Sequence, residues 1–371
     1  MAPKPKLSAT FVYTGQLRQL IPRNVTNVKV RRSIKEIGDD AFHDCKILSR
    51  VELCEGLEKI GKHAFHNCEA LEQIVIPDTV KVIDESAFSG CAKLNLVVLK
   101  EGLEKIGVCA FLQCSSLGCI DVPSTTKSIG DAAFCDCVKL VHMKLSEGLE
   151  LIGNYAFAGC SFEYVILPST VVKLGAGSFT GCKGLIKAEM HEGIEQIGRS
   201  AFANCITLES IRIPASVKDI EVETFSGCTS LKEVKLYDGL HIISQDAFSN
   251  CSSLGSIHMP TTVEIILERA FAHCKTLKEV NLFDGLVRIC KGAFKCCFSL
   301  EHIFIPSTVK AIGAESFAYC TSLTKVYLYE GLIRLISGHS ILVHPLSTSL
   351  CLPLSKRFTE MHSQTAKVWK R

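Results

Sequence analysis

The chain has 371 residues, of which 47% are hydrophobic and 21% are charged, and its formal net charge is +3. This composition supplies enough apolar surface for a large core, which excludes a mainly disordered chain. Because 41 Lys and Arg nearly balance 38 Asp and Glu, we expect neither nucleic acid nor an anionic membrane as the main partner.

Residues 1–27 are predicted to form an N-terminal capping segment. The phrase Ile21-Pro22-x-x-Val25-x-x-Val28 matches later parts of the chain, but no Ala-Phe-x-x-Cys follows it. Phe11-Val-Tyr13 is available to cover the first strand. The start, MAPKPKLSAT, lacks the apolar run of a signal peptide, and no run of about 18 or more apolar residues could span a membrane. We therefore expect a cytoplasmic monomer without membrane insertion.

Residues 28–336 are predicted to form one repeat array built on the phrase Ala-Phe-x-x-Cys. Its phenylalanine recurs thirteen times, at intervals of 23 residues except for one interval of 22, as Phe42, Phe65, Phe88, Phe111, Phe134, Phe157, Phe179, Phe202, Phe225, Phe248, Phe271, Phe294 and Phe317. A fixed period in this range indicates one structural unit stacked on copies of itself. We therefore predict a mainly β repeat solenoid of about 13 coils, and not an enzyme.

Each coil is predicted to hold two short extended segments and one corner. In residues 71–91 the alternation Ile74-x-Ile76 indicates a short strand with one face inward. Val80-x-x-Ile83 indicates a second short extended or turn segment. The stretch Ala87-Phe88-x-x-Cys91 is expected to form a tight helical or irregular corner. No single coil can bury these side chains alone, so stability must come from stacking.

Two types of coil alternate, so the true period is 46 residues. In one type the strand runs into Pro, as at Pro77 and Pro123, and in the other into an acidic residue and Gly, as at Glu101-Gly102. A column of charges follows the same double period, as Lys35, Glu58, Lys81, Glu104, Lys127, Glu150, Val172, Glu195 and Lys218. Because opposite charges across neighbouring strands are favourable, we interpret this column as a device that sets the register.

Thirteen of the twenty cysteines occupy the repeated position. A Cys at one inward place in every coil behaves as a small buried hydrophobic residue, so we expect reduced thiols. Because neighbouring coils bring these sulfurs close together, the distances alone would permit some disulfides. Asn24 and Asn250 each begin a glycosylation triplet, which matters only in an exported protein.

Residues 337–371 lose the pattern. Ser340 stands where a Phe is expected, and Val343 stands where a Cys is expected. The sequence leaves three interpretations open for this segment: a degenerate C-terminal cap, a loose tail, or a wrongly predicted coding end.

The phrase Leu-x-x-Ile-x-Ile-Pro-x-x-Val-x-x-Ile-Gly-x-x-Ala-Phe-x-x-Cys resembles the BspA-like leucine-rich repeat family, also called the Treponema pallidum type. The resemblance covers about 310 residues, in thirteen copies. It implies a right-handed leucine-rich-repeat solenoid with a continuous parallel β-sheet and a protein-binding surface. Bacterial members of the family are often surface adhesins, but this chain shows no signal peptide or anchor.

The outward positions of the strands are the variable ones and form the candidate recognition face. Two groups of apolar side chains stand out there. The aromatic cluster comprises His302, Phe304 and Tyr327, and the aliphatic cluster comprises Val75, Leu96 and Val98. Exposed aromatic residues are candidate hot spots for binding. The alternative interpretation is that β-branched and aromatic residues simply favour strands.

Metal binding and catalysis have weak support in the sequence. His43, His63 and His66 lie in adjacent coils, and the pairs Cys135-Asp-Cys137 and Cys296-Cys297 are suggestive, but none has the spacing of a structural zinc site. No nucleophile–histidine motif, phosphate loop or carboxylate pair is recognisable. We therefore expect no metal, no cofactor and no catalytic residue.

The leading hypothesis is a non-catalytic protein that binds a protein partner through the exposed face of its sheet. The alternative hypothesis is an adhesin-like cell-surface protein exported by an unrecognised route.

Overall fold

The chain folds as a parallel-strand β-solenoid of about 13 turns of about 23 residues, as predicted. The computed structural model describes residues 10–15, 21–328 and 334–335. These residues contain strands and turns and no helix, so none of them lies in a helix that could cross a membrane. The predicted tail 337–371, with Cys351, lies outside the described residues, as do residues 1–9 and 16–20 of the predicted cap.

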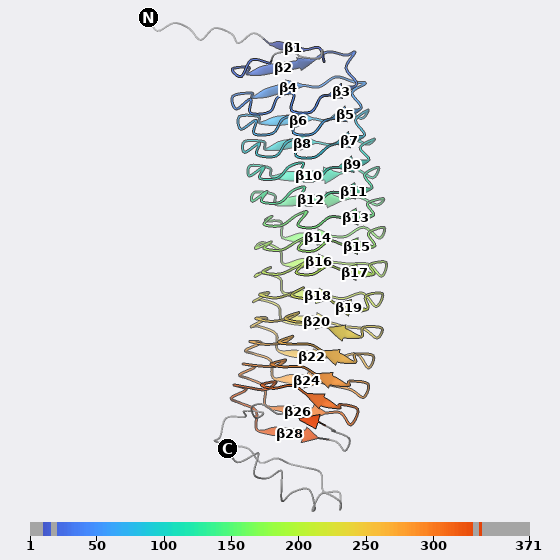
Figure 1. Cartoon of the computed structure of the whole chain (residues 1–371), viewed down its shortest axis with the longest axis vertical. Coiled ribbons are helices and arrows are strands. Elements are labelled where there is room, and N and C mark those ends of the chain that lie inside the picture. The colour runs from blue at the N-terminus through green and yellow to red at the C-terminus, as the bar shows by residue number, and fades with distance from the viewer. Residues whose placement is uncertain (1–9, 16–20, 329–333, 336–371) are drawn as a thin grey trace, which may run out of the picture. The chain divides into compact units, whose positions relative to one another are not determined.

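The described chain divides into two compact units, one ending at Ala188 and the other beginning at Glu189. Figure 1 shows that the long strands of each unit lie side by side, one from each coil. These strands are β1 (Phe11–Tyr13), β2 (Asn27–Val30), β4 (Arg50–Glu52), β6 (Gln73–Val75), β8 (Leu96–Val98), β10 (Cys119–Val122), β12 (His142–Leu145), β14 (Tyr164–Ile166), β16 (Lys187–Glu189), β18 (Ser210–Arg212), β20 (Glu233–Lys235), β22 (Ser256–His258), β24 (Glu279–Asn281), β26 (His302–Ile305) and β28 (Lys325–Leu328).

A second ladder is built from strands of two residues each, at the place of the Val80-x-x-Ile83 phrase. They are β3 (Glu36–Ile37), β5 (Lys59–Ile60), β7 (Val82–Ile83), β9 (Lys105–Ile106), β11 (Ser128–Ile129), β13 (Leu151–Ile152), β15 (Lys173–Leu174), β17 (Gln196–Ile197), β19 (Asp219–Ile220), β21 (Ile242–Ile243), β23 (Ile265–Ile266), β25 (Arg288–Ile289), β27 (Ala311–Ile312) and β29 (Arg334–Leu335).

In the first unit the long strands from β1 to β12 form one parallel sheet in the order β1-β2-β4-β6-β8-β10-β12. Residues 23 apart face each other in this sheet, as Ile74 faces Val97. The short strands from β3 to β15 pair in the same way. Strand β1 pairs with β2, and the Tyr13 ring lies 5.2 Å from the Phe42 ring.

In the second unit the short strands form the longer sheet, in the order β19-β21-β23-β25-β27-β29. Among the long strands, β18 pairs with β20, β22 with β24 and β26 with β28. The alternation of buried and exposed residues along these long strands is the same as in the first unit, so their outward faces are comparable.

The repeated phenylalanines form a stacked ladder inside each unit. In the first unit, ring centroids of successive coils from Phe42 to Phe179 lie 5.1 to 5.5 Å apart, with planes within 12° of parallel. In the second unit the spacing from Phe202 to Phe317 is 5.2 to 5.6 Å. These distances fit offset stacking of aromatic rings. All of these rings are fully buried, which makes the ladder the centre of the core.

In the one coil that is a residue shorter than the others, a large side chain fills the core. The coil after Cys160 is one residue shorter, and Phe162 takes the inward place that Leu140 holds in the coil before. Its buried ring packs edge-on against Phe157 and Phe179, at centroid distances of 6.2 and 6.1 Å. The larger ring thus fills the space that the shortened backbone leaves.

The corner at Ala-Phe-x-x-Cys is irregular and not helical. Its amides donate to the next coil, as His63 N donates to Glu85 O at 2.9 Å and Asn67 N to Ser89 O at 2.8 Å. Both donors have positive φ, 52° and 57°. Such angles are uncommon outside glycine, although Asn and His adopt them more readily than most residues, and the hydrogen bonds between coils help to hold the corner in this shape.

The repeated thiols satisfy backbone acceptors between coils. Cys68 Sγ donates to Phe42 O, 3.2 Å away, while Cys45 N donates to the same carbonyl at 3.1 Å. The same thiol contact, at 3.1 to 3.3 Å, recurs along both units at Cys91, Cys114, Cys137, Cys160, Cys182, Cys228, Cys251, Cys274, Cys297 and Cys320. A buried carbonyl has two lone pairs to satisfy, so Cys here is both a small apolar residue and a donor.

A hydrogen-bonded side-chain contact between adjacent coils, one of each type, explains the 46-residue period. Thr125 Oγ1 accepts a hydrogen bond from Gly102 N at 2.9 Å and donates to Leu103 O at 2.9 Å. Gly102 has a φ of +111°, and a Cβ there would lie 2.0 Å from Asp78 O. The acidic residue before the Gly, Glu101, accepts from Ser124 Oγ at 2.9 Å. The Gly–Thr contact recurs at Gly56–Thr79, Gly148–Thr170, Gly239–Thr262 and Gly285–Thr308.

The predicted charge column forms ion pairs in its first three 46-residue steps. Lys35 Nζ lies 2.9 Å from Glu58 Oε1, Lys81 Nζ lies 3.9 Å from Glu104 Oε1, and Lys127 Nζ lies 3.5 Å from Glu150 Oε1. All six side chains are more than half exposed. Exposed pairs contribute only about 0–1 kcal/mol each, so the column favours one register and adds little to stability.

Candidate protein-binding face

The long strands carry a row of outward side chains held on a rigid support. In β26, Ile303 and Ile305 point inward and are buried, while Phe304 between them is 40% exposed. This alternation follows from the pleat of a β-strand. Each outward residue is therefore fixed by its two buried neighbours, and a partner would meet a surface whose backbone is already ordered.

The aromatic cluster predicted from the sequence comes together in the second unit. Strand β26 pairs with β28 so that Phe304 faces Tyr327 and His302 faces Lys325. The Phe304 and Tyr327 ring centroids lie 4.4 Å apart with planes 6° from parallel. The His302 ring packs edge-on against Phe304 at 5.8 Å. The three rings thus form one continuous aromatic surface beside a lysine.

The aliphatic cluster lies in the first unit on β6 and β8. Val75 faces Val98 across the strand pair, and Leu96 faces Gln73. Val75 is 50% exposed, whereas Leu96 and Val98 are half-buried. Cys119 of β10, which is exposed, faces Leu96 on its other side. This cluster is therefore contiguous, but flatter and less exposed than its sequence suggests.

Sequence reasoning missed a third apolar pair and one mixed pair on the same face. In the first unit, Tyr164 and Ile166 of β14 are 56% and 60% exposed, more than any residue of the predicted clusters. In the second unit, the Arg212 guanidinium carbon lies 5.0 Å from the centroid of the Tyr237 ring. Tyr164 and Ile166 also occupy outward strand positions, but both lie on the same strand. The sequence therefore shows no apolar cluster that extends from one coil to the next at this place.

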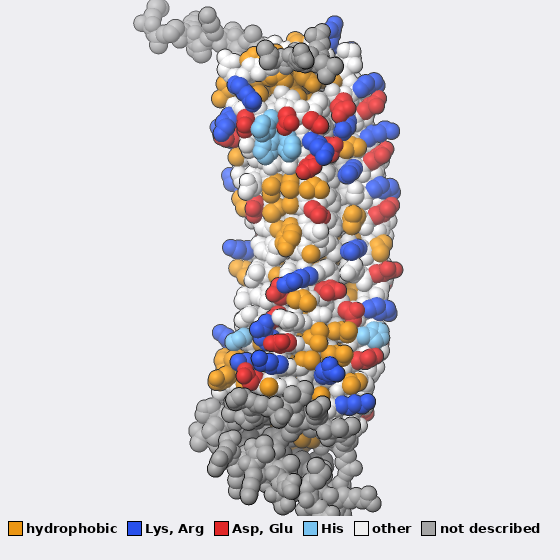
Figure 2. All heavy atoms as spheres, in the orientation of Figure 1, with side chains coloured by type: hydrophobic (Ala, Val, Ile, Leu, Met, Phe, Trp, Pro, Cys, Tyr) orange, Lys and Arg blue, Asp and Glu red, His pale blue; other side chains and the backbone are white. Residues whose placement is uncertain are grey.

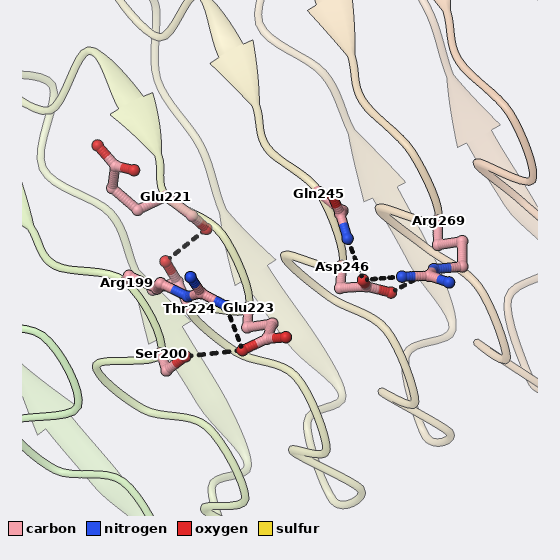
Figure 3. Close-up of polar contacts among 8 residues, drawn as sticks. All are labelled: Arg199, Ser200, Glu221, Glu223, Thr224, Gln245, Asp246 and Arg269. Carbon is pink, nitrogen blue, oxygen red and sulfur yellow. Dashed lines mark hydrogen bonds and ion pairs between the residues drawn. The ribbon is translucent and has the colours of Figure 1, made fainter.

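Two carboxylates of the second unit, Asp246 and Glu223, form hydrogen bonds to residues of an adjacent coil, as Figure 3 shows. The Arg269 guanidinium donates to both oxygens of Asp246, at 3.1 and 2.8 Å, and Gln245 Nε2 donates to Asp246 Oδ2 at 3.1 Å. Ser200 Oγ donates to Glu223 Oε2 at 3.0 Å. These residues occupy the repeated position directly before Ala-Phe or Thr-Phe, except Gln245, which lies one residue earlier. The hydrogen bonds therefore join successive coils. The arrangement presents no pair of carboxylates poised for acid–base chemistry.

A shallow polar groove of about 480 Å³ runs along the corner of the first unit. It arises because Gly90 and Ala92 are small where adjacent coils carry longer side chains. Glu69 at its wall pairs with Lys46 at 2.9 Å. The groove is open, and its charge is partly neutralised.

The cysteines of the described chain are all free, nineteen in number. Burial raises the pKa of the Cys91 and Cys274 thiols to about 12 each. Burial likewise raises the pKa of the half-buried Cys135 to about 11. A nucleophilic or metal-binding Cys must reach the thiolate form, and these remain protonated thiols at neutral pH.

Metal ligands do not converge in the described part of the chain, where no group of three His, Cys, Asp or Glu residues is placed to hold an ion. Cys137 and Cys297, which the sequence singled out, point inward and donate to Phe111 O and Phe271 O. The structure does bring together three histidines, since the His66 ring contacts the rings of both His43 and His63.

Comparison with known proteins identifies the repeat. The family model for the BspA-type leucine-rich repeat region, with six copies, matches residues 22–141, 105–232, 150–274 and 241–341. The chain belongs to the BspA-type leucine-rich repeat family. This confirms the resemblance seen in the sequence. No protein with a curated description matches the chain.

Solved bacterial leucine-rich repeat proteins are similar to this chain. A leucine-rich repeat protein from Bacteroides ovatus is 31% identical, with a TM-score of 0.69 over 82% of this chain and 73% of its own. One from Eubacterium ventriosum is 22% identical, with a TM-score of 0.53 over 87% of each chain. A leucine-rich cell surface protein from Faecalibacterium prausnitzii is 23% identical, with a TM-score of 0.44 over 82% of this chain and 79% of its own.

Proposed function

We propose that this BspA-type repeat protein is a non-catalytic interaction protein that binds a protein partner on the outward face of its long strands. The aromatic cluster of His302, Phe304 and Tyr327 is the main contact. The observation that carries this proposal is the stacked pair of the exposed Phe304 and the half-buried Tyr327 on an ordered strand pair. Aromatic side chains on a pre-ordered surface give binding energy at low entropic cost.

Strand propensity alone does not account for this cluster. The place of Phe304 is occupied in earlier coils of the second unit by residues of quite different kinds, which form equally regular strands: Arg212, Lys235, His258 and Asn281. An aromatic residue is therefore not needed to build the strand. Burial of the ring is not the reason either, because Phe304 stays 40% exposed.

The test is a quantitative pull-down with a triple variant, His302→Ser, Phe304→Ser and Tyr327→Ser. Its thermal unfolding is first compared with wild type, so that a folding defect is recognised. A second variant, Val75→Ser with Val98→Ser, serves as a matched arm on the aliphatic cluster. We expect the first variant to lose wild-type partners that the second retains. Identical partner lists for wild type and the aromatic variant would refute the proposal.

We further propose that the protein works in a reducing compartment, inside the cell. The support is that the ladder thiols donate hydrogen bonds to buried carbonyls, a contact that a disulfide would remove. Titration with a thiol reagent after unfolding in denaturant should find all twenty thiols. Fewer thiols, or a glycan at Asn24 or Asn250, would instead favour the adhesin-like surface protein.

A further inference from the structure

Three histidines of two successive coils form one cluster in the first unit. The His43 and His66 rings lie 5.1 Å apart with planes 18° from parallel, and the His63 ring meets His66 edge-on at 5.7 Å. Figure 2 shows a group of histidine side chains, in pale blue, near the N-terminal end of the array. His66 is the member common to both contacts and therefore sits at the centre of the cluster.

The outer two histidines have counter-charges and the central one does not. His43 Nδ1 lies 3.6 Å from Asp44 Oδ2, and His63 Nδ1 lies 3.6 Å from Asp40 Oδ1. His66 Nδ1 is buried and has no hydrogen-bond partner. A carboxylate stabilises a charged imidazole that it faces, whereas the buried His66 Nδ1 has no such partner.

Protonation of His66 is opposed by its surroundings. A charged imidazole donates from both nitrogens, and a proton on the buried Nδ1 finds no acceptor, which is costly. Burial, followed by the charges of His43 and His63, lowers the pKa of His66, while Asp44 and Asp40 act in the opposite direction more weakly. Asp44 itself is held by a hydrogen bond from Asn67 Nδ2 at 3.0 Å, which lowers its pKa.

The fold does not need a histidine at this place. The residue after the repeated Phe is Ser89, Leu112, Cys135 and Ala158 in the next coils of the same unit, all with the same corner. A metal does not explain the cluster either, since no three described residues are placed to hold one. What distinguishes these coils is that three imidazoles, the side chain whose charge is most sensitive to pH in the physiological range, are packed against each other.

We propose that the cluster of His43, His63 and His66 is a pH-responsive element, which keeps the first coils closed at neutral pH and opens them locally in acid. The sign follows from linkage. His66 binds its proton less readily in the folded coil than in an unfolded one, so the unfolded state takes up more protons below the ordinary histidine pKa of about 6.5. Stability is complete above that pH and falls as the pH drops below it.

The test is hydrogen–deuterium exchange by mass spectrometry of the full chain at about pH 7.5 and about pH 5.5, in EDTA and corrected for the pH dependence of chemical exchange. Between these conditions, protection of the amides in residues 40–70 should fall roughly threefold to tenfold. Protection in residues 105–160 should change little. The His66→Ser variant, which copies Ser89 of the next coil, should lose most of this pH dependence.

The control is His142→Ser, which removes a histidine of β12 outside the cluster and should keep the wild-type response. If His66→Ser does not fold, His43→Ser removes one of the two stacked rings and should weaken the response. The proposal is overturned if wild type and the cluster variants respond to pH alike. It is equally overturned if the loss of protection in acid is spread evenly over the coils of the first unit.

Discussion

Replacing Phe134 by Ala tests whether the phenylalanine ladder is the core of the array. Phe134 is fully buried, between the Phe111 ring at 5.2 Å and the Phe157 ring at 5.4 Å, with both pairs of planes within 5° of parallel. The substitution removes the whole ring and leaves a cavity between two rings that are held by their own coils. It perturbs the core without touching any hydrogen bond of the Phe134 backbone.

The expected loss is about 3–5 kcal/mol of unfolding free energy, the usual range for truncating a buried aromatic residue. The upper half of that range is expected, because two stacked pairs, each worth about 0.5–1.5 kcal/mol, are broken at once. The neighbouring rings cannot move in to fill the cavity, since the backbone hydrogen bonds of the corner fix the spacing between coils.

The assay is urea unfolding followed by circular dichroism, with hydrogen exchange over the same coils to show whether the loss is local, as nearest-neighbour coupling in a repeat array predicts. Tyr164→Ala is the matched control, since it removes an aromatic ring from an outward position that is 56% exposed. It should cost less than about 1 kcal/mol. A loss below about 1 kcal/mol for Phe134→Ala, or equal losses for the two variants, would refute the account of the ladder as core.

Three further changes probe the contacts between coils. Thr125→Val removes the hydroxyl that serves as both acceptor and donor to the preceding coil, and should lower the urea midpoint by an amount equivalent to about 1–3 kcal/mol; Thr125→Ser should cost less. Glu104→Lys should destabilise by about 0.2–1 kcal/mol more than the same change at exposed Glu72, outside the charge column, and equal effects would remove the register interpretation. In the folded protein at about pH 8, iodoacetamide should label exposed Cys119 and spare Cys91, whose pKa is raised to about 12, as peptide mass spectrometry can show.

Much of the candidate face was predictable because a strand has a period of two. Ile303 and Ile305 are apolar at the inward places, so Phe304 had to point outward. The stacking of Phe304 on Tyr327 depends on register, and the constant 23-residue spacing already implied it. The high exposure of Tyr164 and Ile166 was not predicted, because exposure depends on what the adjacent coils place beside a residue and not on its own strand.

The sequence could predict that the three histidines of the cluster lie near each other, but not how their rings and carboxylates meet. The spacing put His43 and His66 in equivalent places of adjacent coils, but the sequence does not say which nitrogen is buried. That Asp44 and Asp40 face the outer rings and leave His66 Nδ1 without a partner follows from side-chain packing in the folded coils.

The coil, its period and its core could all be read from the chain alone, because stacking similar units forces the same apolar side chains into the same place every 23 residues. The sequence also revealed the 46-residue alternation, though not its cause. Only the tertiary structure showed that Thr125 reaches back to Gly102, and that His63 and Asn67 adopt positive φ to donate to the next coil. These features are contacts between coils. The spacing predicts which residues of successive coils face each other, but not which side-chain and backbone atoms meet.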